Sequence, residues 1–159
     1  MNKRAVIKKI IAKLTDELAI YFRAAEASRA EATHEQSKAE SKYDTRGLEA
    51  SYLARGQSRQ AAEIETAITE FEKLAASKSA TNGTIDIGAL VELKMNGESS
   101  FYFIGPRAGG MEVEHNKQEV LVITPQSPLG EQLVGKKAGE SFQLKLGGEL
   151  RPAKIGSVE

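Results

Sequence analysis

The sequence predicts an α+β protein in which a long antiparallel α-helical coiled-coil hairpin is followed by an antiparallel β-sheet domain with one short helix. Residues 3–38 contain neither Pro nor Gly and are rich in Ala, Glu, Lys and Arg, which favour helix. The second half of the chain instead holds short runs of β-branched and aromatic residues separated by glycine-rich turns. We therefore expect a hairpin over residues 1–78 with its tip at about 38–48, a linker at 79–83 and a sheet domain over 84–159.

The helical half carries two apolar seams. Apolar residues recur in alternating steps of four and three, the spacing of helices that pack along a partner helix. Large side chains lie near the base of the hairpin and alanines near its tip, so we expect a firmly held base and a thin tip. The first seam is Ile7, Ile11, Leu14, Leu18, Tyr21 and Ala25, and the second is Ala54, Gln57, Ala61, Ile64, Ile68, Phe71 and Ala75.

In the second half, apolar and polar residues partly alternate within short runs, which is typical of strands joined by tight turns. Between two of these runs, Leu129, Leu133 and Val134 form one apolar face of a short helix, which Gly135 ends. We expect strands within residues 85–95, 99–105, 111–115, 119–125, 141–146 and 151–158.

The composition narrows the possible functions. The 22 basic and 22 acidic residues balance, so no uniform field is available to hold free nucleic acid or an acidic membrane. The chain has no cysteine and two histidines, which excludes disulfides and thiolate sites and disfavours a zinc site. Lysines interrupt the first apolar stretch, so neither a signal segment nor a membrane span is expected. We expect a cytoplasmic monomer that does not act at a membrane.

One segment carries a resemblance to a known family. The stretch "ITPQSPLGEQLVGKKAGESFQL", residues 123–144, is similar to the C-terminal signature of the Gre family of bacterial transcript cleavage factors, which act on RNA polymerase during transcription elongation. In that family a strand ends in Ser-Pro, a short helix follows, and a Gly-Lys turn leads into another strand. The preceding "IDIGALVEL" also resembles the family's entry strand. The matching residues are Ser127, Pro128, Leu129, Leu133, Val134, Gly135 and Lys136.

The resemblance implies a C-terminal domain similar in fold to the FK506-binding proteins and a mode of action on another enzyme. The globular domain would dock at the rim of the polymerase's secondary channel, with contacts near Ser127, Pro128 and Leu129. The coiled coil would reach the active centre, where acidic tip residues help to hold a magnesium ion and the polymerase itself cleaves backtracked RNA. On this reading the free protein is not an enzyme, has no metal or other cofactor of its own, and meets the RNA 3′ end only indirectly.

The expected tip reads "DTRGLEASY", residues 44–52, and departs from the family's pattern of Asp, two residues, Glu-Asn, one residue, Glu-Tyr. Asp44 matches the family's Asp, and Glu49 is the nearest second carboxylate, so these two are the candidates that assist polymerase-bound magnesium. Arg46 places a positive charge where the family has acid, and is a candidate contact to the polymerase. A second role is open for both carboxylates, because Asp44 is also a suitable helix N-cap and Glu49 suits the first turn of a helix.

Four functions remain open from the sequence. The protein either stimulates cleavage of backtracked RNA or occupies the secondary channel and modulates the polymerase without cleavage. A peptidyl-prolyl isomerase is a remote alternative, because its site needs an aromatic-lined pocket and Tyr102 is expected to face away from Phe101 and Phe103. A general coiled-coil partner is the fourth, although the two seams are expected to satisfy each other.

Overall fold

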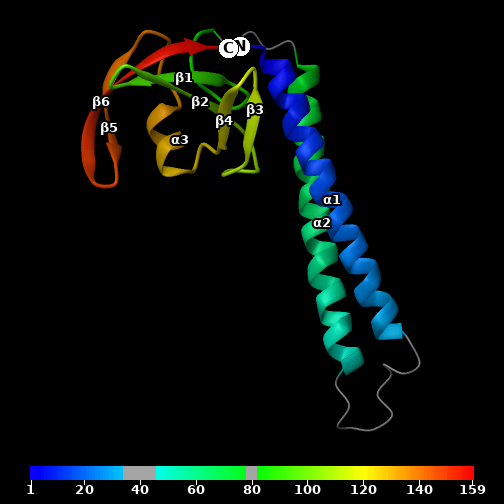
Figure 1. Ribbon diagram of the computed structural model, residues 1–159. Helices are drawn as coiled ribbons and strands as arrows, with labels where there is room; N and C mark the ends of the chain where they lie inside the picture. The colour runs from blue at the N-terminus through cyan, green and yellow to red at the C-terminus, as the bar shows by residue number, and fades with distance from the viewer. Residues whose placement is uncertain (34–45, 78–81) are drawn as a thin grey trace. The chain divides into compact units, whose positions relative to one another are not determined.

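The computed structural model of the protein describes residues 1–33, 46–77 and 82–159. The predicted fold class is confirmed, because two long helices packed as a hairpin precede a six-stranded sheet with one short helix (Figure 1). Most of the predicted tip, and residues 79–81 of the predicted linker, lie outside the described residues. No helix in the described ranges is both long enough and apolar enough to cross a membrane.

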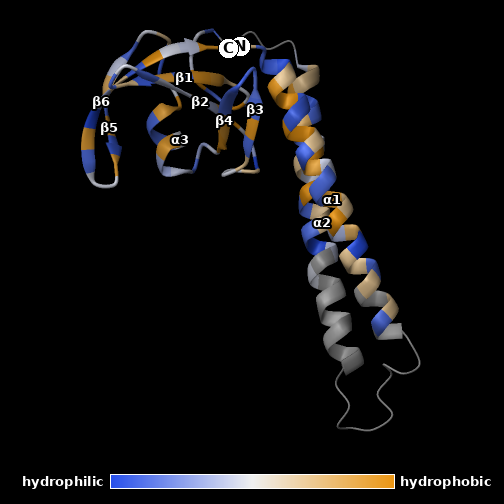
Figure 2. Ribbon diagram, in the orientation of Figure 1, coloured by the Kyte–Doolittle hydropathy of each residue, from blue (hydrophilic) through white to orange (hydrophobic). Residues whose placement is uncertain are grey.

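The hairpin consists of helix α1, Lys3–Thr33, and helix α2, Arg46–Ala76. The predicted seams are confirmed along the described side chains, and Figure 2 shows hydrophobic residues recurring among hydrophilic ones on both helices. The side chains of Ala54 and Gln57 lie outside the described part. The seam positions that are fully buried are Ile7, Leu14, Ala25, Ala61 and Phe71, and those that are half-buried are Ile11, Leu18, Tyr21, Ile64, Ile68 and Ala75.

The chain divides into two compact units, one of residues 1–11 and 70–159 and the other of residues 12–69. The first unit contains the whole sheet together with the opening turns of α1 and the closing turns of α2. The predicted boundaries at residues 78 and 84 follow the change from helix to strand, and as boundaries between separate domains they stay a prediction.

The sheet is mixed, with the strand order β3-β4-β2-β1-β6-β5. Every neighbouring pair is antiparallel except β2 and β4, which run parallel, where an antiparallel sheet was expected. The physical reason is the connection over residues 105–111, which carries the chain past one strand position before the β3–β4 hairpin returns β4 to the place beside β2. The elements are β1 Leu90–Met95, β2 Glu98–Ile104, β3 Glu112–His115, β4 Gln118–Ile123, α3 Pro128–Leu133, β5 Ser141–Leu146 and β6 Glu149–Val158.

Two-residue turns set the register of the three antiparallel hairpins. Asn96 and Gly97 join β1 to β2 with φ of 51° and 82°, which is the left-handed backbone that such turns require. Asn116 and Lys117 do the same between β3 and β4, and two glycines close the β5–β6 hairpin. Each turn therefore determines which side chains of its two strands lie opposite one another.

Alternation along the strands gives the sheet two apolar faces. One face, which includes Ile104 and Ile123, packs with Leu133 of α3 in the main core. The other carries Phe103 and Val122, which lie opposite each other in the β2–β4 register. The remaining residues of the main core are Ile85, Ala89, Val91, Leu93, Leu144, Ala153 and Ile155.

The second apolar face is covered by the base of the hairpin, within the same compact unit. The ring of Phe71 on α2 lies 6.0 Å from that of Phe103, centroid to centroid. Lys9 Nζ on α1 donates a hydrogen bond of 2.5 Å to the carbonyl oxygen of Glu114 on β3. This cover is consistent with the burial of two further residues of α1 outside the predicted seam, Val6 and Ile10.

Candidate functional site

The predicted catalytic tip is described only in part. Asp44 lies outside the described residues, whereas Arg46 is the first residue of α2 and Glu49 lies in its first turn. The side chains of Arg46 and Glu49 also lie outside the described part, so the tip roles of all three residues stay predictions. The helix dipole favours a carboxylate in the first turn of a helix, so the position of Glu49 is favourable whether or not a metal ion binds there.

Ser127, a predicted polymerase contact, caps helix α3. Its Oγ accepts a hydrogen bond of 3.0 Å from the amide of Gly130 and donates one of 2.7 Å to the carbonyl oxygen of Thr124. The backbone has the extended conformation of an N-cap residue, with φ of −67° and ψ of 154°. The donor and one acceptor position of this hydroxyl therefore hold the β4–α3 connection together.

Pro128 and Leu129 differ in what they offer a partner. Pro128 is the first residue of α3 and is exposed, at a position where the missing amide hydrogen has no helical partner to lose. Leu129 is half-buried and packs against the main core. Of the three predicted polymerase contacts in this segment, Pro128 is thus the one that presents most of its side chain to solvent.

The Gly-Lys part of the motif lies in the turn that follows helix α3 and leads toward strand β5. Gly135 has φ of 87°, and its amide donates to the carbonyl oxygen of Ile85. The ammonium group of Lys136 lies 4.5 Å above the centre of the Phe142 ring and 3.4 Å from Glu140 Oε1. The residues that carry the family resemblance therefore have structural roles in capping, turning and anchoring this segment.

The carboxylate of Glu140 is held by the same turn. The backbone amide of Lys137 donates to its Oε2 at 3.0 Å. This hydrogen bond is the main cause that lowers the pKa of Glu140 from its ordinary value. Desolvation opposes it, and the hydrogen bond and charge of Lys136 lower the pKa further. The turn therefore prefers a charged carboxylate at this position.

An acidic group at the β3–β4 edge is visible only once the strand register is known. Glu114 lies directly opposite Glu119, and a side-chain hydrogen bond with Glu112 is the main cause that raises the pKa of Glu119. Repulsion from Glu112 adds to this rise, followed by desolvation and repulsion from Glu114. In the sequence the three residues appear as ordinary surface glutamates, because the predicted strands at 111–115 and 119–125 do not by themselves fix the register that places Glu114 opposite Glu119.

The aromatic residues behind the isomerase alternative do not converge. Phe103 is buried beside Phe71, whereas Tyr102 packs against the main core on the opposite face of the sheet, as alternation predicts. Phe142 lies beneath the ammonium group of Lys136. Phe103 and Tyr102 therefore cannot line one concave pocket together, which weakens the isomerase alternative.

Comparison with known proteins identifies the second half of the chain. Residues 80–159 match the family "Transcription elongation factor, GreA/GreB, C-term". None of the curated protein sequences compared with this chain matches it.

Three solved structures of Gfh1 proteins align with nearly the whole chain at low sequence identity. The GreA factor homolog 1 (Gfh1) of Thermus thermophilus is 20% identical, with 94% of each chain covered and a TM-score of 0.39. Gfh1 of Thermus aquaticus is also 20% identical, with 93% of this chain and 92% of that one covered and a TM-score of 0.39. A further structure of the transcription factor Gfh1 is 20% identical, with 96% and 94% covered and a TM-score of 0.40.

The family assignment rests on the sequence match, which spans 80 of the 159 residues and contains the Ser127 cap, the α3 helix and the Gly135 turn. The chain belongs to the GreA/GreB family of transcription elongation factors.

Proposed function

We propose that this protein binds RNA polymerase at its secondary channel and inserts the tip of the α1–α2 hairpin toward the active centre. The observation that carries the proposal is a GreA/GreB C-terminal domain joined to two helices of 31 residues each. Factors of this family bind RNA polymerase, and a helix of this length reaches about 45 Å at 1.5 Å per residue.

The base of the hairpin supports this role, because a helical hairpin that enters a channel must be held firmly at its base. Phe71 packs on Phe103, and Gly105 lies so close to Phe71 that even a Cβ atom there would be 3.0 Å from its Cζ. An ion pair of 2.9 Å joins Arg107 Nε to Glu70 Oε2 beside this contact. The helical base is thus built into the same compact unit as the family domain.

At the tip, Asp44 and Glu49 are the residues that we expect to assist the polymerase's magnesium ion. Hard carboxylate oxygens suit a divalent cation, and a second metal can stabilise both the attacking and the leaving oxygen of a phosphodiester. The catalytic centre belongs to the polymerase, so the factor would act without an active site of its own.

A second candidate function is occupancy of the channel without cleavage. It is favoured by the tip sequence, which lacks the family's Glu-Asn pair and places Arg46 two residues after Asp44. A guanidinium there would contact acidic groups of the polymerase centre or an RNA phosphate, or it would neutralise Asp44.

Cleavage is tested with stalled, backtracked polymerase complexes that carry end-labelled RNA. Under the cleavage proposal the protein shortens the RNA, Asp44→Asn abolishes shortening, and Glu63→Gln, which alters an exposed carboxylate of α2, does not. Asparagine retains the ability to cap a helix while it removes the charge, so this variant separates metal assistance from capping. Binding without shortening establishes the second candidate, and absence of binding overturns both.

Docking of the globular domain is tested separately through Ser127, Pro128 and Leu129. We expect Pro128→Asp to weaken binding to polymerase about tenfold or more, because an exposed apolar ring would be replaced by a charge that must lose its water. Ser127→Ala should weaken binding mainly through the loss of the α3 cap, and should also lower the melting temperature. Unchanged binding by Pro128→Asp would contradict a contact at this segment.

A further inference from the structure

We propose that the free edge of strand β5 binds an extended, acidic peptide segment of a partner protein, which adds to the sheet as a further strand. The surface concerned, called here the β5 edge surface, consists of the outward-facing residues of β5 and β6: Ser141, Gln143, Lys145, Leu150, Pro152 and Lys154. It includes neither the tip nor the predicted polymerase contacts Ser127, Pro128 and Leu129, so it stands whether or not the proposed function holds.

The hydrogen-bond direction along β5 follows from its hairpin. Leu146 and Glu149 flank a two-residue turn and therefore form the first hydrogen-bonded pair, so the next residue, Lys145, directs its amide and carbonyl away from β6. Two bonds confirm this direction, because Gln132 of α3 accepts from the Lys145 amide at 2.8 Å and donates to its carbonyl oxygen at 3.0 Å. By the same alternation, Ser141 and Gln143 direct their amides and carbonyls to the open edge.

The residue opposite Gln143 agrees with this assignment. Pro152 has no amide hydrogen and faces Gln143 in the register, so this pair cannot exchange two backbone hydrogen bonds. Within the part of the chain that the structure describes, no hydrogen bond covers the outward backbone groups of Ser141 and Gln143. Two amides and two carbonyls thus remain available to an added strand.

The opposite edge of the sheet shows how an edge is protected. On β3, the outward carbonyl oxygen of Glu114 accepts a hydrogen bond from the Lys9 ammonium group. The side chains of Glu114 and Glu119 lie opposite each other at the same edge. Charged side chains and covered backbone groups are common means by which proteins discourage strand addition. On β5 the cover ends at Lys145, and the two open residues have small or neutral side chains, Ser141 and Gln143.

The charges on the β5 edge surface favour an acidic occupant. The two charged residues of this surface, Lys145 and Lys154, are both exposed lysines. Lys154 also lies directly opposite Lys94 of β1, and like charges at opposite positions of an antiparallel pair repel each other. Carboxylates at alternate positions of an added strand would relieve this repulsion and pair with the lysines.

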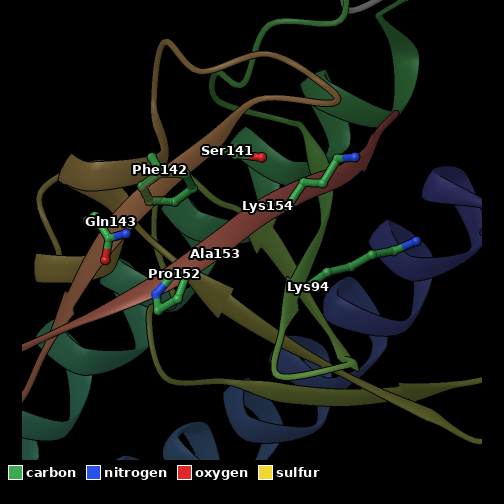
Figure 3. A pocket seen from close by; sticks show the side chains of 7 residues that line it. All are labelled: Lys94, Ser141, Phe142, Gln143, Pro152, Ala153 and Lys154. Carbon is green, nitrogen blue, oxygen red and sulfur yellow. The ribbon is translucent and has the colours of Figure 1, made fainter.

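A shallow depression lies beside the edge and gives the added side chains a place to pack. It has a volume of about 450 Å³ and is lined by the residues that Figure 3 labels, with Ser141 beside Lys154 and with Gln143 and Pro152 together at the other end. Neighbouring strands lie about 4.8 Å apart, so the side chains of an added strand would reach this depression and the exposed Leu150. Backbone pairing would supply affinity, and the lysines would supply the preference for acid.

The direct test uses the peptide acetyl-Thr-Glu-Val-Glu-Thr-amide with a fluorescent label and measures its binding to the whole protein by anisotropy. We expect Gln143→Pro to weaken binding at least about tenfold, because it removes an outward amide while keeping a position that does not bond to β6. Gln143→Ala keeps the amide and should therefore weaken binding far less than Gln143→Pro does. Circular dichroism and the melting temperature check that the proline variant folds.

The charge requirement is tested without altering the backbone. Lys145→Glu combined with Lys154→Glu should weaken the acidic peptide about tenfold and improve binding of the matching peptide with lysines in place of glutamates. Lys73→Ala is the control, since Lys73 is an exposed lysine of helix α2 outside the β5 edge surface and its depression. We expect it to change binding little.

Other results would overturn the proposal. Absence of peptide binding, or binding that Gln143→Pro leaves unchanged in a folded protein, excludes strand addition. Tight binding of a single-stranded RNA oligomer that depends on the lysines but not on Gln143 would assign the surface to nucleic acid. Concentration-dependent dimerisation that Gln143→Pro abolishes would assign the edge to a second copy of the chain.

Discussion

The two ends of the described hairpin are made from the same two helices but are held in different ways. At the base, Val6, Ile7, Ile10 and Phe71 are at most 1% exposed, and they belong to the compact unit that contains the sheet. Along the rest of the hairpin the buried seam includes alanines such as Ala25, and large apolar side chains are exposed. The exposed fractions are 59% for Ile20 and 50% for Phe22.

The difference shows that helix propensity favours both ends of the hairpin, whereas packing against the sheet stabilises only the base. A large apolar side chain contributes roughly 1.5–3 kcal/mol when fully buried, and an alanine contributes far less. Segments with few buried apolar contacts open locally at lower free energy than the core does. We therefore expect amide hydrogens of residues 12–33 and 46–69 to exchange faster than those of the helical base.

The largest expected effect comes from removing the ring at the base. Phe71→Ala should lower the free energy of unfolding by about 3–5 kcal/mol, because it leaves a cavity against Phe103 and beside Gly105. Chemical denaturation monitored by circular dichroism measures the loss. Ile64→Ala, at a half-buried position of the same helix, is the matched control and should cost clearly less. Equal losses would show that the sheet adds nothing to the base.

A smaller effect should come from replacing Gly105, because neighbouring atoms at the base of the hairpin leave no space for a side chain there. A Cβ atom at Gly105 would lie 2.8 Å from the carbonyl oxygen of Arg107, 2.9 Å from Val122 Cγ1 and 3.0 Å from Phe71 Cζ. We expect Gly105→Ala to destabilise the protein by about 1–3 kcal/mol, measured as a shift of the denaturation midpoint.

The matched control for this substitution is Gly56, which lies within α2 in the other unit and has nothing within 4 Å of the Cβ position. Gly56→Ala should stabilise the protein by about 0.5–1 kcal/mol, because alanine loses less conformational entropy in a helix. Destabilisation by Gly56→Ala, or tolerance of Gly105→Ala, would remove the contrast between the two regions.

The smallest effects concern the pH dependence of two exposed carboxylates. The pKa of Glu140 is lowered from 4.5 in the folded state, so its contribution to stability is present above the unfolded pKa and is lost as pH falls through the folded value. The pKa of Glu119 is raised, so its contribution is present below the unfolded pKa and is lost as pH rises through the folded value.

Melting temperatures measured from pH 3 to pH 7 separate the two cases. Relative to the original chain, Glu140→Gln should be less stable near neutral pH, and this deficit should shrink as pH falls. Glu119→Gln should gain stability near neutral pH, where the change removes repulsion from Glu112 and Glu114. Curves that remain parallel to that of the original chain would contradict these assignments.

The predictions from the sequence succeeded where a repeating pattern determines the structure. The heptad spacing gave the described seam from Ile7 to Phe71, and the Ser127 to Gly135 motif placed α3 and its turn. The heptad pattern predicts only the side chains that face the partner helix. It therefore missed Val6 and Ile10, which are buried in the unit that also contains the sheet.

The pairing of strands was harder to predict than their positions. The parallel alignment of β2 with β4 depends on the path of residues 105–111, which carry no periodic signal. The like-charge pair of Lys94 and Lys154 likewise depends on the register of strands that are distant in the chain. The tip residues Asp44, Arg46 and Glu49 remain predictions, because their side chains lie outside the described part.

The bond between Lys9 and Glu114 joins residues 105 positions apart, which has a consequence for folding during synthesis. The first turns of α1 leave the ribosome well before the sheet strands of the same unit, since that unit combines residues 1–11 with 70–159. Val6 and Ile10, which lie outside the seam with α2, must therefore keep exposed apolar surface until the sheet has formed. Completion of the helical base is thus a late, long-range step, even though helices themselves form quickly.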